Sequence, residues 1–204
     1  MTELSANIAV IAATIGTVTF LIPQIVKLIR TKDSAGVSTT WPALGFVTNI
    51  GWFVYVISQS LWAAMVAPFV TFLSYGMTLW ALARTGRGLR VSAVRGVAWA
   101  VLLVSTAAAL GWEALGVVLG LSYGVMLAPS VWTAYRTVDP SGISPGTWWI
   151  GTAEAVLWGY YGVFHADAGI ITFGIVGLLG SSLMLIRFYT TRPHAPAPME
   201  EPAR

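Results

Sequence analysis

The sequence contains no cysteine and few charged residues. Without cysteine among its 204 residues, the chain has neither a disulfide framework nor a thiolate metal site, and cysteine usage says nothing about its redox compartment. Charged residues make up only 9% of the sequence and apolar residues 56%, whereas about a quarter of an average soluble domain is charged. This composition excludes an ordinary globular enzyme, and the net charge of +3 is too small to indicate nucleic-acid binding.

Motifs of enzyme sites are also missing from the sequence. There is no glycine-rich phosphate loop, no cluster of His, Asp and Glu with metal-ligand spacing, and no Ser-His-acid set. We therefore expect no enzymatic activity, no cofactor and no metal.

Long uncharged runs take up most of the chain. They cover residues 4–26, 34–83, 96–112, 114–135 and 168–186, and residues 140–166 are interrupted only by Glu154. A transmembrane helix needs about 20 apolar residues, so the run 34–83 has room for two helices with a turn near residues 58–60. The sequence thus predicts an all-α membrane protein with seven transmembrane helices.

The basic residues predict the orientation of these helices. In this arrangement every Lys and Arg falls on one side of the membrane, whereas the opposite loops carry Glu3, Glu113, His165 and Asp167. Because short cytoplasmic loops are rich in Lys and Arg, we expect the N-terminus outside and the C-terminus in the cytoplasm, in a multi-pass protein of the plasma membrane. Residues 191–204, rich in Pro and Ala, are expected to form a disordered cytoplasmic tail.

The sequence resembles itself at an offset of 106 residues. Identical residues recur in order at this offset, among them Pro23/Pro129, Arg30/Arg136, Trp52/Trp158 and Tyr55/Tyr161. Each copy covers three helices, so a further helix must invert the chain for the copies to be parallel. We therefore predict a first three-helix repeat at residues 1–86, a linker helix at 87–111 and a second three-helix repeat at 112–190, as two parallel bundles related by an axis along the membrane normal.

Short motifs in both copies resemble those of a known family. The segment around Pro23-Gln24, followed by Arg30 and Asp33, is similar to the PQ-loop motif shared by SWEET, SemiSWEET and cystinosin-like proteins, although the second copy reads Pro129-Ser130. The segments 51–55 and 157–161 resemble the Trp-aromatic-Tyr segments of SWEET helices. Four prolines match the helix prolines of that family, namely Pro23, Pro42, Pro129 and Pro145. The resemblance covers residues 6 to 190 and implies a transporter that works by alternating access.

The chain departs from SWEET sugar transporters at one pair of positions. Those proteins resemble each other in an asparagine in the third helix of each unit, and near the matching places this chain has Ala67 and Phe173. The sugar-binding role of the asparagines does not carry over, but the resemblance still places Ala67 and Phe173 at the substrate site.

Glu154 is the residue most indicative of chemistry in the sequence. It falls midway between Asp139 and Asp167, which bracket its helix, and therefore near the bilayer centre. A carboxyl at that depth is either protonated or paired with a cation, and such acids usually face a cavity or a pathway. Glu154 is thus a candidate for proton coupling or substrate binding, or else a protonated acid bonded to a neighbouring hydroxyl or carbonyl.

Two helical stripes are expected to face each other at the midplane. Residues three and four apart lie on one helix face, which groups Glu154, Trp158 and Tyr161 on one helix and their repeat partners Thr48, Trp52 and Tyr55 on another. The paired tryptophans either stack on a solute or belong to the interfacial aromatic belts. Five other tryptophans near span ends are interpreted as belt residues, namely Trp41, Trp62, Trp112, Trp148 and Trp149.

The remaining candidate positions are one amide and the motif prolines. Asn49 falls in mid-span, where its amide either bonds a neighbouring helix or lines the pathway. Prolines remove a backbone hydrogen bond and loosen a helix, so Pro23, Gln24 and Pro129, about two turns before the cytoplasmic helix ends, are candidates for an inner gate. Pro42 and Pro145 are assigned to the same hinge set, with a static kink as the alternative.

Three functions are open at this point. The first is facilitated transport of a sugar, which follows from the family resemblance. The second is proton-coupled transport of an amino acid or a cationic solute, which follows from Glu154. The third is a receptor or assembly protein on the same fold. The expected partners are a small-molecule substrate and the lipid bilayer, with a homo-oligomer possible.

Overall fold

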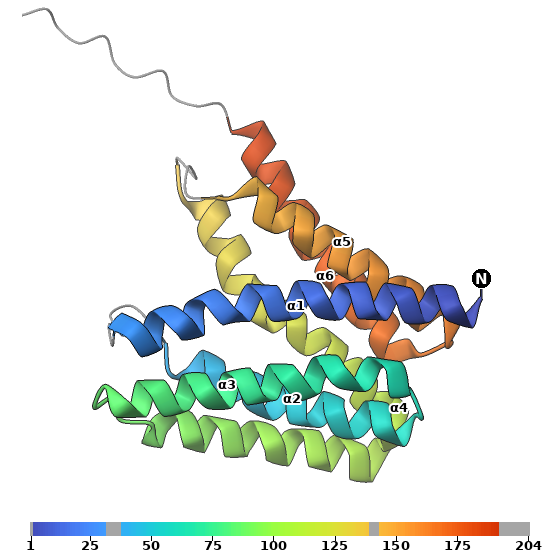
Figure 1. Cartoon of the computed structure of the whole chain (residues 1–204), viewed down its shortest axis with the longest axis horizontal. Coiled ribbons are helices and arrows are strands. Elements are labelled where there is room, and N and C mark those ends of the chain that lie inside the picture. The colour runs from blue at the N-terminus through green and yellow to red at the C-terminus, as the bar shows by residue number, and fades with distance from the viewer. Residues whose placement is uncertain (1, 32–37, 139–142, 192–204) are drawn as a thin grey trace, which may run out of the picture.

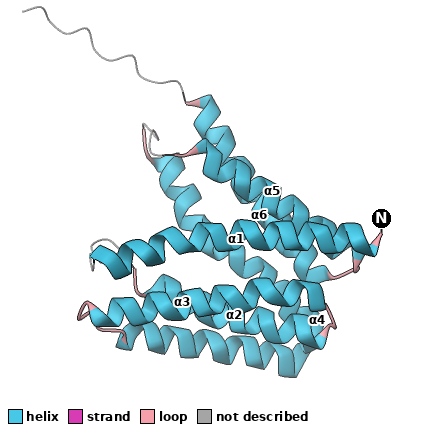
Figure 2. Ribbon diagram, in the orientation of Figure 1, coloured by secondary structure: helices cyan, strands magenta, loops and turns pink. Residues whose placement is uncertain are grey.

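The computed structural model describes residues 2–31, 38–138 and 143–191, and every regular element in them is helical (Figure 2). The elements are α1 (Glu3–Thr31), α2 (Thr40–Ser58), a 3₁₀ turn η1 (Trp62–Met65) that leads into α3 (Val66–Arg84), α4 (Arg90–Arg136), α5 (Pro145–Phe164) and α6 (Ala168–Thr190). The predicted all-α class is confirmed for these residues. The segment expected to be a disordered tail lies, after Thr191, outside the described residues.

Helix α4 consists of two helices joined at a sharp break. Gly111 has φ 87° and ψ 179°, which is non-helical, and helical backbone lies on both sides of it. The break lies near the end of the uncharged run 96–112, two residues before Glu113, which separates this run from the run 114–135. Only glycine adopts these angles without strain, because any other side chain clashes with its own backbone.

Replacing Gly111 with alanine is expected to lower the free energy of unfolding by about 1–3 kcal/mol. A Cβ at Gly111 would meet no atom within 4 Å, so the cost arises from the backbone angles alone. Thermal unfolding of the purified protein measures it, and Gly16→Ala is the matched control, because a Cβ there also meets nothing within 4 Å and Gly16 lies inside a helix. Equal unfolding temperatures for the two variants would contradict the assignment of strain.

The helices pack in a regular order (Figure 1). Helix α3 lies between α1 and α2, and α6 lies between the second half of α4 and α5, while α1 and α2 make no close contact with each other in the described residues. Helix α1 also packs on α5, and α2 packs on α4. The helix that comes third in each predicted repeat therefore lies between the other two, and the two groups touch through α1 with α5 and through α2 with α4.

The turns that follow α2 and α5 have the same geometry. Ser60 and Ala166 are the non-glycine residues of the described chain with positive φ, at 59° and 52°. The backbone N–H of Leu61 donates to the Val56 carbonyl at 2.8 Å, and that of Asp167 donates to the Gly162 carbonyl at 2.9 Å. Both the positive-φ residues and the bonded pairs are separated by 106 positions, the offset of the sequence repeat.

The chain is a membrane protein by the length and composition of its helices. Four helical segments are long and apolar enough to cross a bilayer, and they are Thr40–Ser58, Trp62–Arg84, Arg90–Arg136 and Ala168–Thr190. Large apolar side chains are exposed on the outer surface, for example Val104 at 68%, Leu110 at 72% and Val125 at 72%. Such a surface is stable in hydrocarbon and unfavourable in water.

The largest apolar core lies at one end of the molecule. Val10, Tyr55, Leu119 and Tyr161 are almost fully buried in it, and α1, α2, α4, α5 and α6 all contribute. At the other end, α5, α6 and the second half of α4 slant away from α1 to α3 (Figure 1). The helix groups therefore converge at the α1 N-terminal end and separate toward the end that carries the arginines of α3 and α4.

The prolines of the predicted hinge set occupy two kinds of position. Pro129 lies inside α4, seven residues before its last residue Arg136, as a hinge near a helix end requires. Pro42 lies in the first turn of α2 and Pro145 begins α5. The first four N–H groups of a helix have no intrahelical acceptor, so Pro42 and Pro145 remove no hydrogen bond from their helices, and their role as hinges stays a prediction. Pro23 and Gln24 lie in helical backbone of α1, but their side chains are outside the described residues.

Candidate functional site

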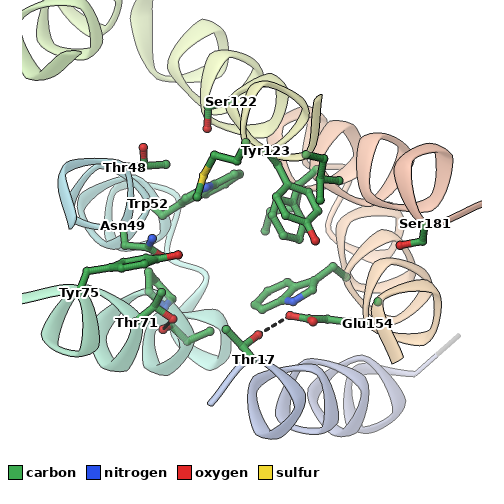
Figure 3. A pocket seen from close by; sticks show the side chains of 18 of the residues that line it. Thr17, Thr48, Asn49, Trp52, Thr71, Tyr75, Ser122, Tyr123, Glu154 and Ser181 are labelled. Carbon is green, nitrogen blue, oxygen red and sulfur yellow. Dashed lines mark hydrogen bonds between the residues drawn. The ribbon is translucent and has the colours of Figure 1, made fainter. Parts of the chain in front are cut away.

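A central cavity of about 530 Å³ lies between the two helix groups (Figure 3). Seven of the predicted site residues line it: Thr48, Asn49, Trp52, Ala67, Glu154, Trp158 and Phe173. The cavity volume lies in the range of about 300–1,000 Å³ that small-molecule sites occupy in proteins. The structure therefore brings these seven residues together around one space.

Two predicted site residues lie beyond the cavity. Tyr55 and Tyr161 are 2% and 1% exposed and belong to the apolar core at the convergent end. Their helices tilt toward each other there, so the stripe that lines the cavity at Trp52 and Trp158 enters packed protein one turn later.

Most of the residues that line the cavity occupy paired positions at the repeat offset. Fourteen lining residues form seven pairs separated by 106 positions, and the pairs are Thr17/Tyr123, Trp41/Thr147, Thr48/Glu154, Trp52/Trp158, Ala64/Ile170, Ala67/Phe173 and Tyr75/Ser181. Sequence reasoning missed Thr17, Tyr123, Tyr75 and Ser181 because none of them is charged or part of a motif. Trp41 and Trp148 also line the cavity, although they were interpreted as belt residues.

Glu154 joins the two helix groups across the cavity. The Thr17 hydroxyl of α1 donates a hydrogen bond to Glu154 Oε1 of α5 (Figure 3). Among the lining residues that the structure describes there is no Lys, Arg or His. Glu154 carries the one carboxyl among these described lining residues, and it has no cationic side chain to pair with there.

Aromatic rings fill one side of the cavity. Phe173 lies between the paired tryptophans, with ring-centroid distances of 6.0 Å to Trp52 and 6.1 Å to Trp158 and edge-to-face geometry in both cases. Tyr123 stacks on Phe173 at 4.6 Å with an interplanar angle of 21°. The residue at the paired position of the other helix group is Ala67, which has no aromatic ring. The cavity is therefore aromatic at Phe173 and has no matching ring at Ala67.

The side of Ala67 carries polar groups. Asn49, Thr71 and Tyr75 line the cavity there (Figure 3). Asn49 Nδ2 donates to the Gly45 carbonyl of its own helix at 2.8 Å, so the amide lines the cavity and bonds to the backbone of α2. The polar hydroxyl and amide groups can supply hydrogen bonds to a solute.

The first half of α4 is hydrogen-bonded to the α2 side of the cavity wall. Trp99 Nε1 donates to Thr48 Oγ1 at 2.9 Å, and Thr39 and Ser92 share a hydrogen bond of 2.6 Å. The first half of α4, which connects the two helix groups, is thus hydrogen-bonded to α2 and to Thr39, the residue just before α2.

The convergent end of the cavity is closed by a buried hydrogen bond and by apolar packing. The Tyr55 hydroxyl donates to Asp167 Oδ2 at 2.8 Å, and Asp167 Oδ1 accepts the backbone N–H of Ile170 at 2.8 Å at the start of α6. Gly116 makes room for Tyr55, because a Cβ at Gly116 would lie 2.4 Å from the Tyr55 hydroxyl oxygen. Asp167 was expected only as a loop residue, yet it joins α6 to α2.

The opposite end of the cavity extends to the first turns of α2 and α5. Trp41 lies in the first turn of α2, Thr147 and Trp148 lie in the first turn of α5, and all three line the cavity. Trp41 and Ser130 of this wall are solvent-exposed or lipid-exposed. The cavity is therefore sealed at the Tyr55 end and extends to the end where the helix groups separate.

Residues 6–64 match the family model of the PQ loop repeat. The matched segment covers most of α1, all of α2 and most of η1. It contains Thr17, Thr48 and Trp52 of the cavity wall. No curated protein matches the chain in a sequence comparison.

Proposed function

We propose that this chain is a PQ-loop membrane transporter that carries a small solute by alternating access. The observation that carries the proposal is the central cavity, whose wall is built from seven residue pairs at the 106-residue offset and is sealed at one end. Transporters built from internal repeats hold their substrate at the repeat interface near the bilayer midplane. The match of residues 6–64 to the PQ loop repeat supports the same family.

Two parallel three-helix repeats joined by an inverting helix account for the packing. A pseudo-two-fold axis along the membrane normal exchanges α1 with the second half of α4, α2 with α5, and α3 with α6. Under this exchange, the α1–α5 contact becomes a contact between α2 and the second half of α4. Both occur, since α1 packs on α5 and Tyr55 of α2 lies against Gly116 of α4. The duplicated turns at Ser60 and Ala166 support the same register.

The proposed orientation follows from the charges and places the protein in the plasma membrane. With the N-terminus outside, the Tyr55–Asp167 bond lies at the outer end and the arginines at the cytoplasmic end. The described conformation is then closed to the outside, with its cavity extending toward the cytoplasm.

The lining chemistry favours facilitated transport of a sugar. Flat aromatic rings stack on the apolar face of a sugar, and hydroxyl and amide groups bond its hydroxyls. Trp52 and Trp158 supply the rings, and Asn49, Thr71 and Tyr75 line the polar side. A site that hydrogen-bonds solute hydroxyls rejects solutes that lack them.

A second candidate function, proton-coupled transport of a cationic solute or an amino acid, is favoured by Glu154. The carboxyl lies in the cavity wall, is bonded to Thr17 and has no described basic partner, so its charge can be balanced by a proton or by a solute cation. A non-transporting receptor or assembly protein on the same fold is less favoured, because we expect its midplane to be closed by side chains, whereas this chain has a cavity of about 530 Å³ there.

Solute efflux from vesicles containing the purified protein tests the proposal. A panel of labelled monosaccharides and disaccharides is expected to yield at least one sugar that leaves faster than from protein-free vesicles. Trp158→Ala should weaken the apparent affinity at least about fivefold, since aromatic stacking contributes about 1 kcal/mol. The control is Trp149→Ala, a tryptophan outside the cavity wall that is 55% exposed. If no sugar moves, or if both variants behave alike, the sugar-binding role of the paired tryptophans is excluded.

A further inference from the structure

A second hollow lies on the outer surface, in the seam between α4 and α6. It has a volume of about 480 Å³. It is lined by Gly124, Ala128, Trp132 and Tyr135 of α4 and by Gly180 of α6. Gly124 and Gly180 let the two helices pack closely, because a Cβ at Gly180 would lie 2.6 Å from Leu127 and one at Gly124 would lie 3.1 Å from Val176. We call this hollow the α4–α6 groove.

The groove has the length of one lipid leaflet. Its lining residues on α4 run from Gly124 to Tyr135, which corresponds to about 16 Å at a rise of about 1.5 Å per residue. Half of a hydrocarbon core of about 30 Å is about 15 Å. The groove is lined almost entirely by apolar side chains, and an extended acyl chain fits both its length and its chemistry.

Two arginines stand at one end of the groove. The guanidinium of Arg136 lies 4.4 Å from the ring centroid of Trp132, and that of Arg187 lies 5.8 Å from the ring centroid of Tyr135. Arg187 also donates to the backbone carbonyls of Ala134 and Thr137. In the part of the chain that the structure describes, neither guanidinium is paired with a carboxylate, and Trp, Tyr and Arg at a helix end are typical of headgroup level.

We propose that the α4–α6 groove binds one acyl chain of an anionic phospholipid, with the headgroup at Arg136. A basic position between transmembrane helices suits an anionic headgroup, whereas a zwitterionic lipid gains no net attraction there. This proposal rests on the membrane placement of α4 and α6 but not on solute transport. Leu127 lines both this groove and the central cavity, so the lipid would contact a residue of the cavity wall.

Native mass spectrometry of the purified full-length protein tests the groove with phosphatidylglycerol and phosphatidylcholine of identical acyl chains. One phosphatidylglycerol per chain should be retained in preference to phosphatidylcholine. Ala128→Phe places a ring in the groove and should abolish this preference. Its matched control is Val125→Phe, which adds a similar ring on the same helix at a side chain that is 72% exposed and does not line the groove.

A second pair of variants tests the headgroup position. Arg136→Gln should weaken phosphatidylglycerol binding about fivefold, the equivalent of about 1 kcal/mol per arginine near the headgroups. Arg84→Gln is the control, because Arg84 also stacks on a tryptophan, Trp80, at 5.0 Å but does not border the groove. Equal retention of both lipids, or an unchanged preference in Ala128→Phe and Arg136→Gln, would overturn the proposal. A shift of Ala128→Phe from dimer to monomer would also overturn it and assign the groove to a second copy of the chain.

Discussion

Replacing Glu154 with glutamine is expected to weaken solute affinity about tenfold or more while leaving solute exchange measurable. Glutamine keeps the shape of the side chain and still accepts a hydrogen bond from Thr17, the partner of Glu154 in the cavity wall. It removes the titratable proton and the charge that an ionised carboxyl offers to a bound solute, and a hydrogen bond to a charged group contributes about 1.5–3 kcal/mol. Counterflow of labelled against unlabelled solute in vesicles measures the affinity.

The same variant separates the two candidate functions. If transport is proton-coupled, Glu154→Gln should abolish accumulation driven by a pH gradient and spare exchange, because exchange returns a loaded carrier and needs no net proton movement. If the protein is a sugar uniporter, a pH gradient drives no accumulation in either protein, and the variant should change mainly the affinity.

Glu113→Gln is the matched control for this experiment. Glu113 is exposed beside the Gly111 break and does not line the cavity. Unchanged affinity and unchanged pH response in Glu154→Gln would mean that the carboxyl only bonds Thr17 and plays no part in transport.

The charged residues and the internal repeat of the sequence predicted one helix boundary and part of the cavity wall. Glu113, which separates two uncharged runs, located the α4 break within two residues of Gly111. The period of the helix and the 106-residue offset identified Glu154, Trp52 and Trp158, which all line the cavity. These features depend on charge and on spacing along one helix, and both can be read from a sequence.

Other parts of the cavity depend on how helices tilt and where they begin. Tyr55 and Tyr161 continue the predicted stripes but lie in packed core, because the helices converge at that end. Pro145 was assigned inside a helix, whereas α5 begins at it. Tyr123 carries no motif, and its role in the wall becomes visible only once its repeat partner Thr17 is seen beside Glu154.

Removing the Tyr55 hydroxyl is expected to open the convergent end of the cavity. The bond from Tyr55 to Asp167 at 2.8 Å joins α2 of one group to the start of α6 in the other, so a state in which this end is open must break it. Tyr55→Phe removes the donor and leaves the ring. Because a bond made in only one of two states shifts the population toward that state, its loss should favour the open state about tenfold or more, from about 1.5–3 kcal/mol for a hydrogen bond to a charged acceptor.

The absence of native cysteine makes this opening measurable with a single introduced thiol. Ala64 is 0% exposed and lines the cavity at its closed end, so Ala64→Cys should react slowly with a membrane-impermeant maleimide. Adding Tyr55→Phe should raise the labelling rate from the N-terminal side about tenfold. Tyr135→Phe is the control, since its hydroxyl bonds the Leu183 carbonyl at 3.0 Å near the other end. If Tyr55→Phe leaves the labelling rate unchanged, the apolar core around Leu119 and Tyr161 closes this end without help from the hydrogen bond.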